Sequence, residues 1–118
     1  MTVTSPATAG SMTHISVHEV AVLLDQGAAL IDVREHQETA TGSAPGARFI
    51  PLQQFSLEEL PADRALVLMC RSGARSGAAA QALAEMGFTT YNVVGGMAAW
   101  AAAGYPVMAE DGRPGRVL

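Results

Sequence analysis

Short runs of consecutive apolar residues recur along the chain and predict buried strands. The strongest run is Ala65–Met69, which is apolar at every position, as is typical of a parallel strand covered on both faces. A second run, Ala29–Val33, is interrupted only by Asp32. Shorter segments predict three more strands, at residues 14–15, 48–50 and 90–94.

Segments with helical spacing and helix-capping residues lie between these strands. Ser16 and Glu19 form a capping-box pattern, and the helix that they begin ends at Gly27. The longest predicted helix, Ser76–Met86, is rich in Ala and is followed by Gly87. Three shorter helical segments are predicted at residues 35–41, 56–60 and 97–103. This alternation of strands and helices predicts an α/β domain with a mostly parallel central sheet.

The 118 residues suffice for one domain with a single core. Residues 1–12 are mostly Thr, Ser, Ala and Gly, and they predict a flexible leader. Residues 109–118 contain two glycines and a proline, and they predict a loose C-terminal tail. The sequence thus predicts one compact unit over residues 13–108.

The charge of the chain argues against several classes of partner. Seven basic and eleven acidic residues give a net charge of −4, and all of the basic residues are Arg. An acidic chain without a basic block is a poor nucleic-acid binder and has no polybasic membrane patch. No apolar run approaches the roughly 18 residues of a membrane span, and the first residues do not resemble a secretory signal. We therefore expect a soluble, cytoplasmic protein.

Cysteine and histidine usage narrows the chemistry further. The single cysteine, Cys70, excludes an internal disulfide and a four-thiolate zinc site, and it fits a reducing compartment. The three histidines lack the close spacing of metal ligands. We therefore expect no metal site.

Cys70 follows the strongest predicted strand and begins the loop that leads into the longest predicted helix. Open α/β sheets bind ligands at the carboxyl ends of their strands. Gly73 allows a tight turn, whose N–H groups can hold an anion together with the start of the helix. With Arg71 and Arg75 nearby, the thiol pKa should fall below its free value of about 8.5. This context favours a nucleophilic thiolate over an inert core cysteine.

The segment Cys70-Arg-Ser-Gly-Ala-Arg-Ser76 resembles the active-site loop of rhodanese-homology domains. Further motifs of that family occur in the same order over about residues 13–107. They are Ile31–Glu35, Gly42–Ala47 followed by Ile50-Pro51, Gly95-Gly96 with Trp100, and Gly104–Val107. Any one of these motifs is modest evidence, whereas four in order support the resemblance strongly.

The resemblance implies a rhodanese-like three-layer α/β domain with a central five-stranded, mostly parallel sheet flanked by helices. It implies a sulfurtransferase whose catalytic Cys70 carries sulfur as a persulfide. The donor would be a small anion such as thiosulfate, and the acceptor would be cyanide, a thiol or a partner protein. The substrate-binding loop would comprise Arg71, Ser72, Gly73, Ala74, Arg75 and Ser76. The reaction needs no metal or organic cofactor, and we expect a monomer.

The residues around the loop allow more than one interpretation. Arg71 either attracts the donor anion or is an ordinary surface residue. Arg75 is expected to shape the loop, paired with Asp32 or Glu35. Asp32 could support the site from the neighbouring strand or have only a capping role, and Arg34 is expected to pair with Glu35. The hydroxyl groups of two loop serines can donate hydrogen bonds, although the second serine could simply cap the helix.

Other functions remain open at this point. Phosphatase loops of related shape enclose five residues between Cys and Arg, whereas Cys70 and Arg75 enclose four. A thiol-dependent reductase, such as one acting on arsenate, would need a resolving thiol from another molecule. A non-catalytic interaction module is the remaining alternative, and the intact Cys70 loop argues against it.

Overall fold

In the computed structural model, which describes residues 10–118, the chain forms a five-stranded sheet with the order β1-β5-β4-β2-β3. All neighbouring strands pair in parallel, which confirms the predicted fold class. The strands are β1 (Ser11–Ile15), β2 (Ala29–Asp32), β3 (Arg48–Phe49), β4 (Leu66–Met69) and β5 (Thr89–Val93).

The central strand β4 contributes side chains to both faces of the sheet. Leu66 and Leu68 belong to the core on one face, as does Cys70 directly after the strand, and Val67 and Met69 belong to the core on the other face. This division follows from the two-residue repeat of a strand. Because both faces are covered, every residue of β4 is buried, which explains its continuously apolar sequence.

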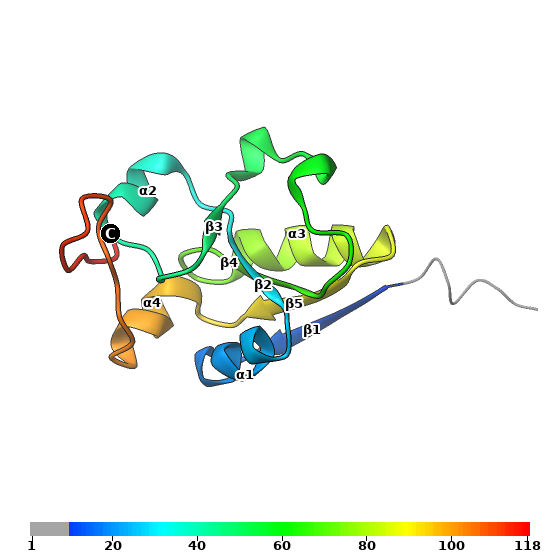
Figure 1. Ribbon diagram of the computed structural model, residues 1–118, viewed down its shortest axis with the longest axis horizontal. Coiled ribbons are helices and arrows are strands. Elements are labelled where there is room, and N and C mark those ends of the chain that lie inside the picture. Colours follow the sequence, from blue (N-terminus) through cyan, green and yellow to red (C-terminus); the bar gives the residue numbers. More distant parts are fainter. Residues whose placement is uncertain (1–9) are drawn as a thin grey trace, which may run out of the picture.

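Helices and short 3-10 helices cover the two faces of the sheet (Figure 1). The longest helix, α3 (Ala74–Glu85), packs on the face that contains Cys70, together with η3 (Leu52–Gln54). The short η4 (Leu57–Glu59) lies between Phe55 and Leu60, which pack on the same face. The opposite face is covered by η2 (Val17–Glu19), α1 (Val20–Asp25) and α4 (Gly96–Ala102). The remaining helix, α2 (His36–Thr41), follows β2.

The first helix differs from its prediction in one respect. Its capping box is present, since the Ser16 N–H donates to Oε1 of Glu19 at 3.0 Å. The first turn is nevertheless a 3-10 turn, and regular α-helix starts only at Val20. The segment predicted as a helix after Ser56 is likewise reduced to the single 3-10 turn η4, and Pro61 follows it closely.

The sequence predicts a loose tail over residues 109–118, and this prediction is wrong. The C-terminal segment folds back against α2 at one end of the molecule (Figure 1). The N–H groups of Glu110 and Arg116 donate to the carbonyls of Ala40 and Thr41 at 3.0 and 2.8 Å. These acceptors are the free carbonyls at the end of α2. The composition of residues 109–118 gives no sign of them, because they belong to another part of the chain.

The boundary between the predicted N-terminal leader and the folded domain also differs from the prediction. The sequence places a leader over residues 1–12, but β1 already begins at Ser11 and pairs with β5 from Thr89 onward. The pairing partner, which lies almost eighty residues away, provides the hydrogen bonds that order this polar segment. Residues 1–9 lie outside the described part of the chain, and no helix within residues 10–118 is long and apolar enough to cross a membrane.

Candidate active site

Cys70 is the first residue after β4, at the carboxyl edge of the sheet. The helix α4 fixes its backbone, because Met97 N–H donates to the Cys70 carbonyl at 2.8 Å. The next residue is held in the same way, since Ala98 N–H donates to the Arg71 carbonyl at 3.0 Å. The loop between β4 and α3 is therefore tied to the opposite layer of the domain.

Several hydrogen-bond donors converge on the sulfur of Cys70. Gly73 N–H lies 3.1 Å from Sγ, and Ser76 contributes its N–H at 3.4 Å and its hydroxyl at 3.3 Å. The residue is completely buried. Burial alone raises the pKa of the thiol, but the hydrogen bonds from Ser76, Gly73 and Ser72 outweigh burial and lower the pKa below its ordinary value.

Gly73 gives the loop its shape. Its φ of +99° lies in the left-handed region, where glycine carries no steric penalty. A Cβ atom at this position would lie 3.0 Å from the carbonyl oxygen of Val93 on β5. The turn brings the Gly73 N–H back toward the sulfur, and α3 starts at Ala74, two residues earlier than predicted.

Arg75 is held by a residue that the sequence did not suggest. Its guanidinium donates to both carboxylate oxygens of Glu38 on α2, at 2.8 and 2.9 Å. The expected pairing with Asp32 or Glu35 is therefore wrong. The Arg75 hydrogen bonds lower the pKa of Glu38 to about 2. A capping-box spacing between Glu35 and Glu38 was the available sequence signal, and Glu35 N–H does donate to Oε1 of Glu38 at 3.0 Å.

Asp32 and Arg34 form a buried ion pair, with 2.7 Å between Oδ2 and Nη2. The expected pairing of Arg34 with Glu35 is therefore wrong. Nη2 of Arg34 also donates to the Gly42 carbonyl at 2.8 Å. The pair thus ties the end of β2 to the end of α2, the helix that carries Glu38.

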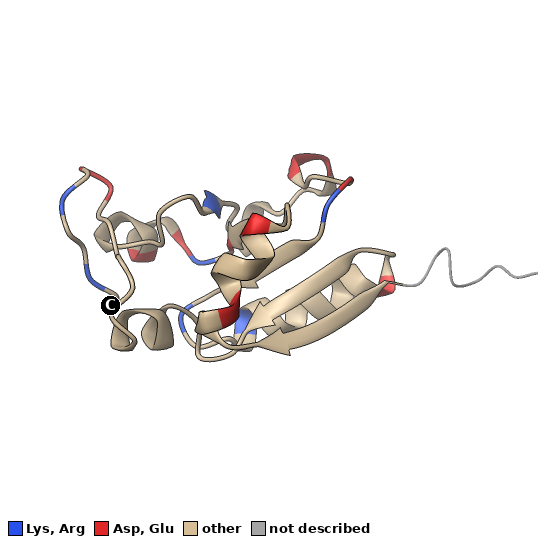
Figure 2. Ribbon diagram, turned by 60° about the horizontal axis from the view of Figure 1, so that its bottom comes forward, with Lys and Arg blue, Asp and Glu red and all other residues tan. Residues whose placement is uncertain are grey.

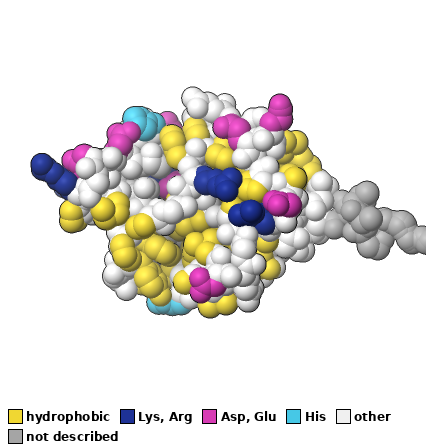
Figure 3. Space-filling view, in the orientation of Figure 1, with side chains coloured by type: hydrophobic (Ala, Val, Ile, Leu, Met, Phe, Trp, Pro, Cys, Tyr) yellow, Lys and Arg dark blue, Asp and Glu magenta, His cyan; other side chains and the backbone are white. Residues whose placement is uncertain are grey.

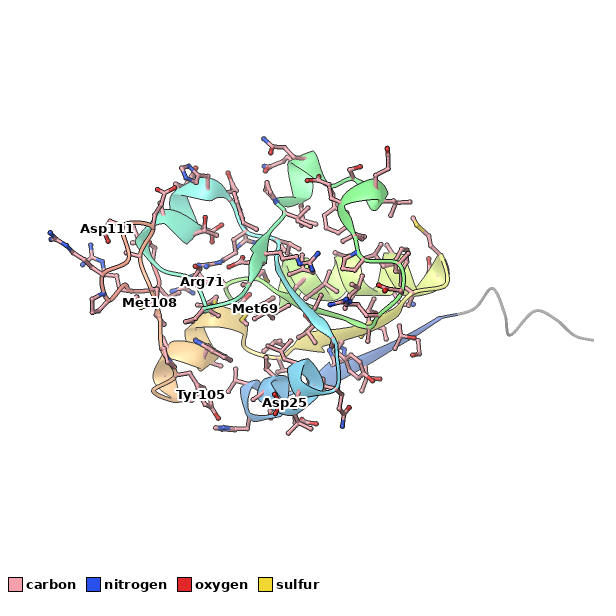
Figure 4. All side chains as sticks on the ribbon, in the orientation of Figure 1. Asp25, Met69, Arg71, Tyr105, Met108 and Asp111 are labelled. Carbon is pink, nitrogen blue, oxygen red and sulfur yellow. The ribbon has the colours of Figure 1, made fainter. Side chains whose placement is uncertain are left out.

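The remaining loop side chains differ in exposure. Arg71, Ser72 and Ala74 are exposed, whereas Ser76 is fully buried. Arg71 donates through Nε to the backbone oxygen of Leu118. Figure 4 shows Arg71 beside the C-terminal segment that carries Met108.

A cavity of about 430 Å³ lies between α4, Arg71 and the C-terminal segment. Its walls are mainly apolar, and hydrophobic side chains also gather around this region on the surface (Figure 3). Two arginines are among the residues that line it, Arg71 and Arg116. Elsewhere in the described chain the basic residues are scattered over several elements (Figure 2).

Two further polar residues near the sulfur, Asn92 and His14, were not predicted from the sequence. The Ser76 hydroxyl lies 2.6 Å from Oδ1 of Asn92 on β5, and Nδ2 of Asn92 lies 3.2 Å from Nδ1 of His14 on β1. Asn92 is 3% exposed. The only sequence signal for Asn92 was a polar residue within a strand that is expected to be buried. Its contacts could not be predicted, because they join three segments that are distant in the sequence.

Two further cavities lie at the opposite edge of the sheet, near the amino ends of β4 and β5. They measure about 510 and 370 Å³ and share Asp63, Arg64 and Ala65 in their walls. Neither is lined by a cysteine or a serine. Within residues 10–118 there is also no group of three His, Cys, Asp or Glu side chains that could hold a metal ion.

The fold and this loop place the chain in a known class of α/β proteins. The family model described as a rhodanese-like domain matches residues 16–103. The chain belongs to the rhodanese-like domain family.

Individual relatives agree with this assignment. A protein of Allochromatium vinosum named sulfurtransferase is 40% identical over 86 residues, which cover 70% of this chain and 80% of that protein. The crystal structure of a rhodanese-related protein from Thermoplasma volcanium superimposes with a TM-score of 0.76 at 29% identity, covering 83% of this chain and 99% of the other. A rhodanese-like domain protein from Staphylococcus aureus gives a TM-score of 0.68 at 31% identity, covering 75% and 91% of the two chains.

Proposed function

We propose that this protein is a sulfurtransferase that carries sulfane sulfur as a persulfide on Cys70. The observation that carries the proposal is the convergence of three hydrogen-bond donors on one buried sulfur at the carboxyl edge of the sheet. Donors in that arrangement stabilise negative charge on sulfur without the reorganisation that water would need. The name of the Allochromatium vinosum relative supports the same reaction class.

In the first half-reaction, the Cys70 thiolate attacks the outer sulfur of thiosulfate. The S–S bond of thiosulfate breaks, sulfite leaves with the bonding electron pair, and a Cys70 persulfide anion remains. The total charge of −3 is the same on both sides. The N–H groups of Gly73 and Ser76 face the sulfur and would also stabilise the persulfide anion.

In the second half-reaction, a nucleophile attacks the outer sulfur of the persulfide. Cyanide would leave as thiocyanate, and a thiolate would leave as a new persulfide, while Cys70 returns to the thiolate. The acceptor can be a small thiol or a thiol of a partner protein. Two half-reactions through a covalent intermediate predict ping-pong kinetics.

The residues around Cys70 receive roles that follow from their contacts. Arg71 is exposed and lines the cavity with Arg116, so it would attract the anionic donor. Arg75 is held by Glu38 and would shape the loop rather than bind the donor. Asp32 and Arg34 would support the site indirectly, since they anchor α2.

Intact-protein mass spectrometry tests the proposal directly. The reduced protein is incubated with thiosulfate, with folded Cys70→Ser as the control. We expect a gain of one sulfur atom on the wild type only, and cyanide should remove it. Persulfide formation or sulfur transfer by folded Cys70→Ser would refute the mechanism. A wild type that gains no sulfur from thiosulfate, and is active only with arsenate and a thiol, would instead favour the reductase.

A further inference from the structure

The Ser76 hydroxyl has one hydrogen and two acceptors within reach. Sγ of Cys70 lies 3.3 Å from Oγ, and Oδ1 of Asn92 lies 2.6 Å from it. All three residues are buried, so water cannot easily take the place of either acceptor. A single hydroxyl proton cannot serve both at full strength. The sulfur and the amide oxygen therefore compete for it.

The orientation of the Asn92 amide follows from its other neighbours. Nδ2 lies 3.1 Å from the carbonyl oxygen of Gly73, a group that can only accept. The second hydrogen of Nδ2 faces Nδ1 of His14 at 3.2 Å. A flipped amide would place two acceptor oxygens against each other at Gly73. Oδ1 is thus held toward Ser76, where it accepts the hydroxyl proton.

The competition has a different outcome in each state of the sulfur. In the thiol, the Cys70 S–H can donate to Oγ of Ser76, and the Ser76 hydroxyl can donate to Asn92, so each proton has an acceptor. In the free thiolate, the hydroxyl must turn to the sulfur, and Oδ1 of Asn92 then loses its donor. In a persulfide, the charge lies on the outer sulfur, so the hydroxyl can return to Asn92.

We propose that Asn92 is a positioning residue that withdraws the Ser76 hydroxyl from Cys70 and so disfavours the free thiolate relative to the thiol and the persulfide. The persulfide part of this inference rests on the proposed sulfurtransferase function, whereas the thiol part does not. Asn92 would thereby favour retention of sulfur on the enzyme until an acceptor arrives.

Other charged and titratable groups face this cluster and enter any pH measurement. Arg75 on α3 interacts electrostatically with the Cys70 sulfur, and Glu38 and Glu35 face Arg75 in turn. His14 faces Asn92 from β1. All of these groups are present in each of the variants compared below, so the presence of these groups does not by itself distinguish the variants.

The test is the pH dependence of Cys70 alkylation by iodoacetamide in four proteins: the wild type, Asn92→Leu, Ser76→Ala and the double variant. Leucine has the same branching as asparagine but offers neither the Oδ1 acceptor nor the Nδ2 donor. We expect Asn92→Leu to lower the pKa of Cys70 by about 0.5 to 1, the net value of one hydrogen bond. Ser76→Ala should raise the pKa, and the double variant should match Ser76→Ala.

The double variant separates this proposal from a merely structural role. If Asn92 only holds the loop, its loss would displace the Gly73 and Ser76 N–H groups and raise the pKa of Cys70 in both backgrounds. That result, or a lowered pKa that persists without the Ser76 hydroxyl, would overturn the proposal.

The sulfur-transfer steps give a second readout. A thiolate with a lower pKa leaves faster, so the Asn92→Leu persulfide should pass its sulfur to a thiol about two- to threefold faster than the wild type. An equal or slower discharge would remove the persulfide part of the proposal. If no persulfide forms on the wild type, the proposed function fails, and the alkylation result still decides the thiol part.

A measurement on the wild type removes any dependence on how the variants fold. The side-chain amide NMR signals of Asn92 should shift with the titration of Cys70, because the donor to Oδ1 changes. In Cys70→Ser this titration should be absent. Asn92 signals that do not follow the Cys70 titration would contradict the proposal.

Discussion

Glu38 accepts two hydrogen bonds from Arg75 and one from the backbone of Glu35. The Arg75 hydrogen bonds are the main reason that its pKa falls from 4.5 to about 2. The carboxylate is largely buried, but the Arg75 side chain is 39% exposed, so solvent screens part of the attraction. At the scale of single residues, this ion pair joins α2 to the start of α3, beside the Cys70 loop.

Glu38→Gln should reduce the free energy of unfolding by about 1 kcal/mol at pH 7. A carboxylate with a lowered pKa stabilises the fold above its unfolded pKa, and the contribution is lost as the pH falls toward its folded pKa. The difference between wild type and Glu38→Gln should therefore shrink between about pH 4.5 and pH 2. Urea unfolding across this range measures it.

Glu59→Gln, which changes an exposed carboxylate on η4, is the matched control. It should alter stability little at either end of the pH range. A Glu38→Gln protein that keeps the same deficit at pH 2 would show that the loss comes from packing and not from the ion pair.

At the scale of elements, the contact between α4 and the Cys70 loop is unusually close. Gly96 begins α4 with a φ of +53°, and a Cβ atom there would lie 2.2 Å from the carbonyl oxygen of Cys70. Only glycine lets the helix approach far enough for Met97 N–H to reach that carbonyl. The Gly95-Gly96 pair thus helps to hold the Cys70 loop in place.

Gly96→Ala should destabilise the fold by at least about 3 kcal/mol, because backbone strain and a steric clash with the loop act together. Gly104→Ala is the control, since its φ of +86° imposes the strain while a Cβ atom there meets nothing within 4 Å. It should lose only about 1–2 kcal/mol. Equal melting temperatures for the two variants would exclude the clash as a cause.

At the scale of the whole molecule, the C-terminal segment brings a second arginine to the cavity beside Arg71. Arg116 N–H is bonded to Thr41, and its side chain lines the same cavity as Arg71. The close approach of Gly115 to Thr41 allows this path, because a Cβ atom at Gly115 would lie 2.5 Å from the Thr41 oxygen. Two positive charges at one cavity raise the local concentration of anions.

Arg116→Gln should raise KM for thiosulfate about two- to fivefold at low salt, as expected for one partly screened charge. Arg113→Gln is the control, because Arg113 lies in the same segment, faces Asp111 at 3.9 Å and is not among the residues that line the cavity. Steady-state kinetics at two salt concentrations measure both variants. A KM that changes equally in both would assign the effect to net charge rather than to the cavity.

Much of the site could be predicted because its signals are local. The apolar run before Cys70 indicates a buried strand, and Gly73 indicates the turn that aims the loop amides at the sulfur. The order of short motifs along the chain was enough to indicate the family. These features depend on neighbouring residues and on the spacing of apolar residues along a strand, both of which can be seen in the sequence.

The partners of the charged and polar side chains were decided only by the tertiary structure. The sequence led us to expect that Arg75 pairs with Asp32 or Glu35. The position of α2 instead places Glu38 beside Arg75. Asn92 and His14 reach the site because β5 lies between β1 and β4 in the sheet. Such contacts join residues that are far apart in the chain. The local pattern of the sequence therefore does not show which of them lie close together in the fold.

The sequence by itself determined which residue is the proposed nucleophile, which strand precedes it and where the following loop turns. The tertiary structure decided which groups share its protons, which carboxylate holds Arg75 and where the C-terminal segment lies. The physical reason is that propensity and hydrophobic period act over a few residues. Ion pairs, shared protons and backbone approaches depend instead on ångström-scale distances that exist only after the sheet and its two layers have assembled.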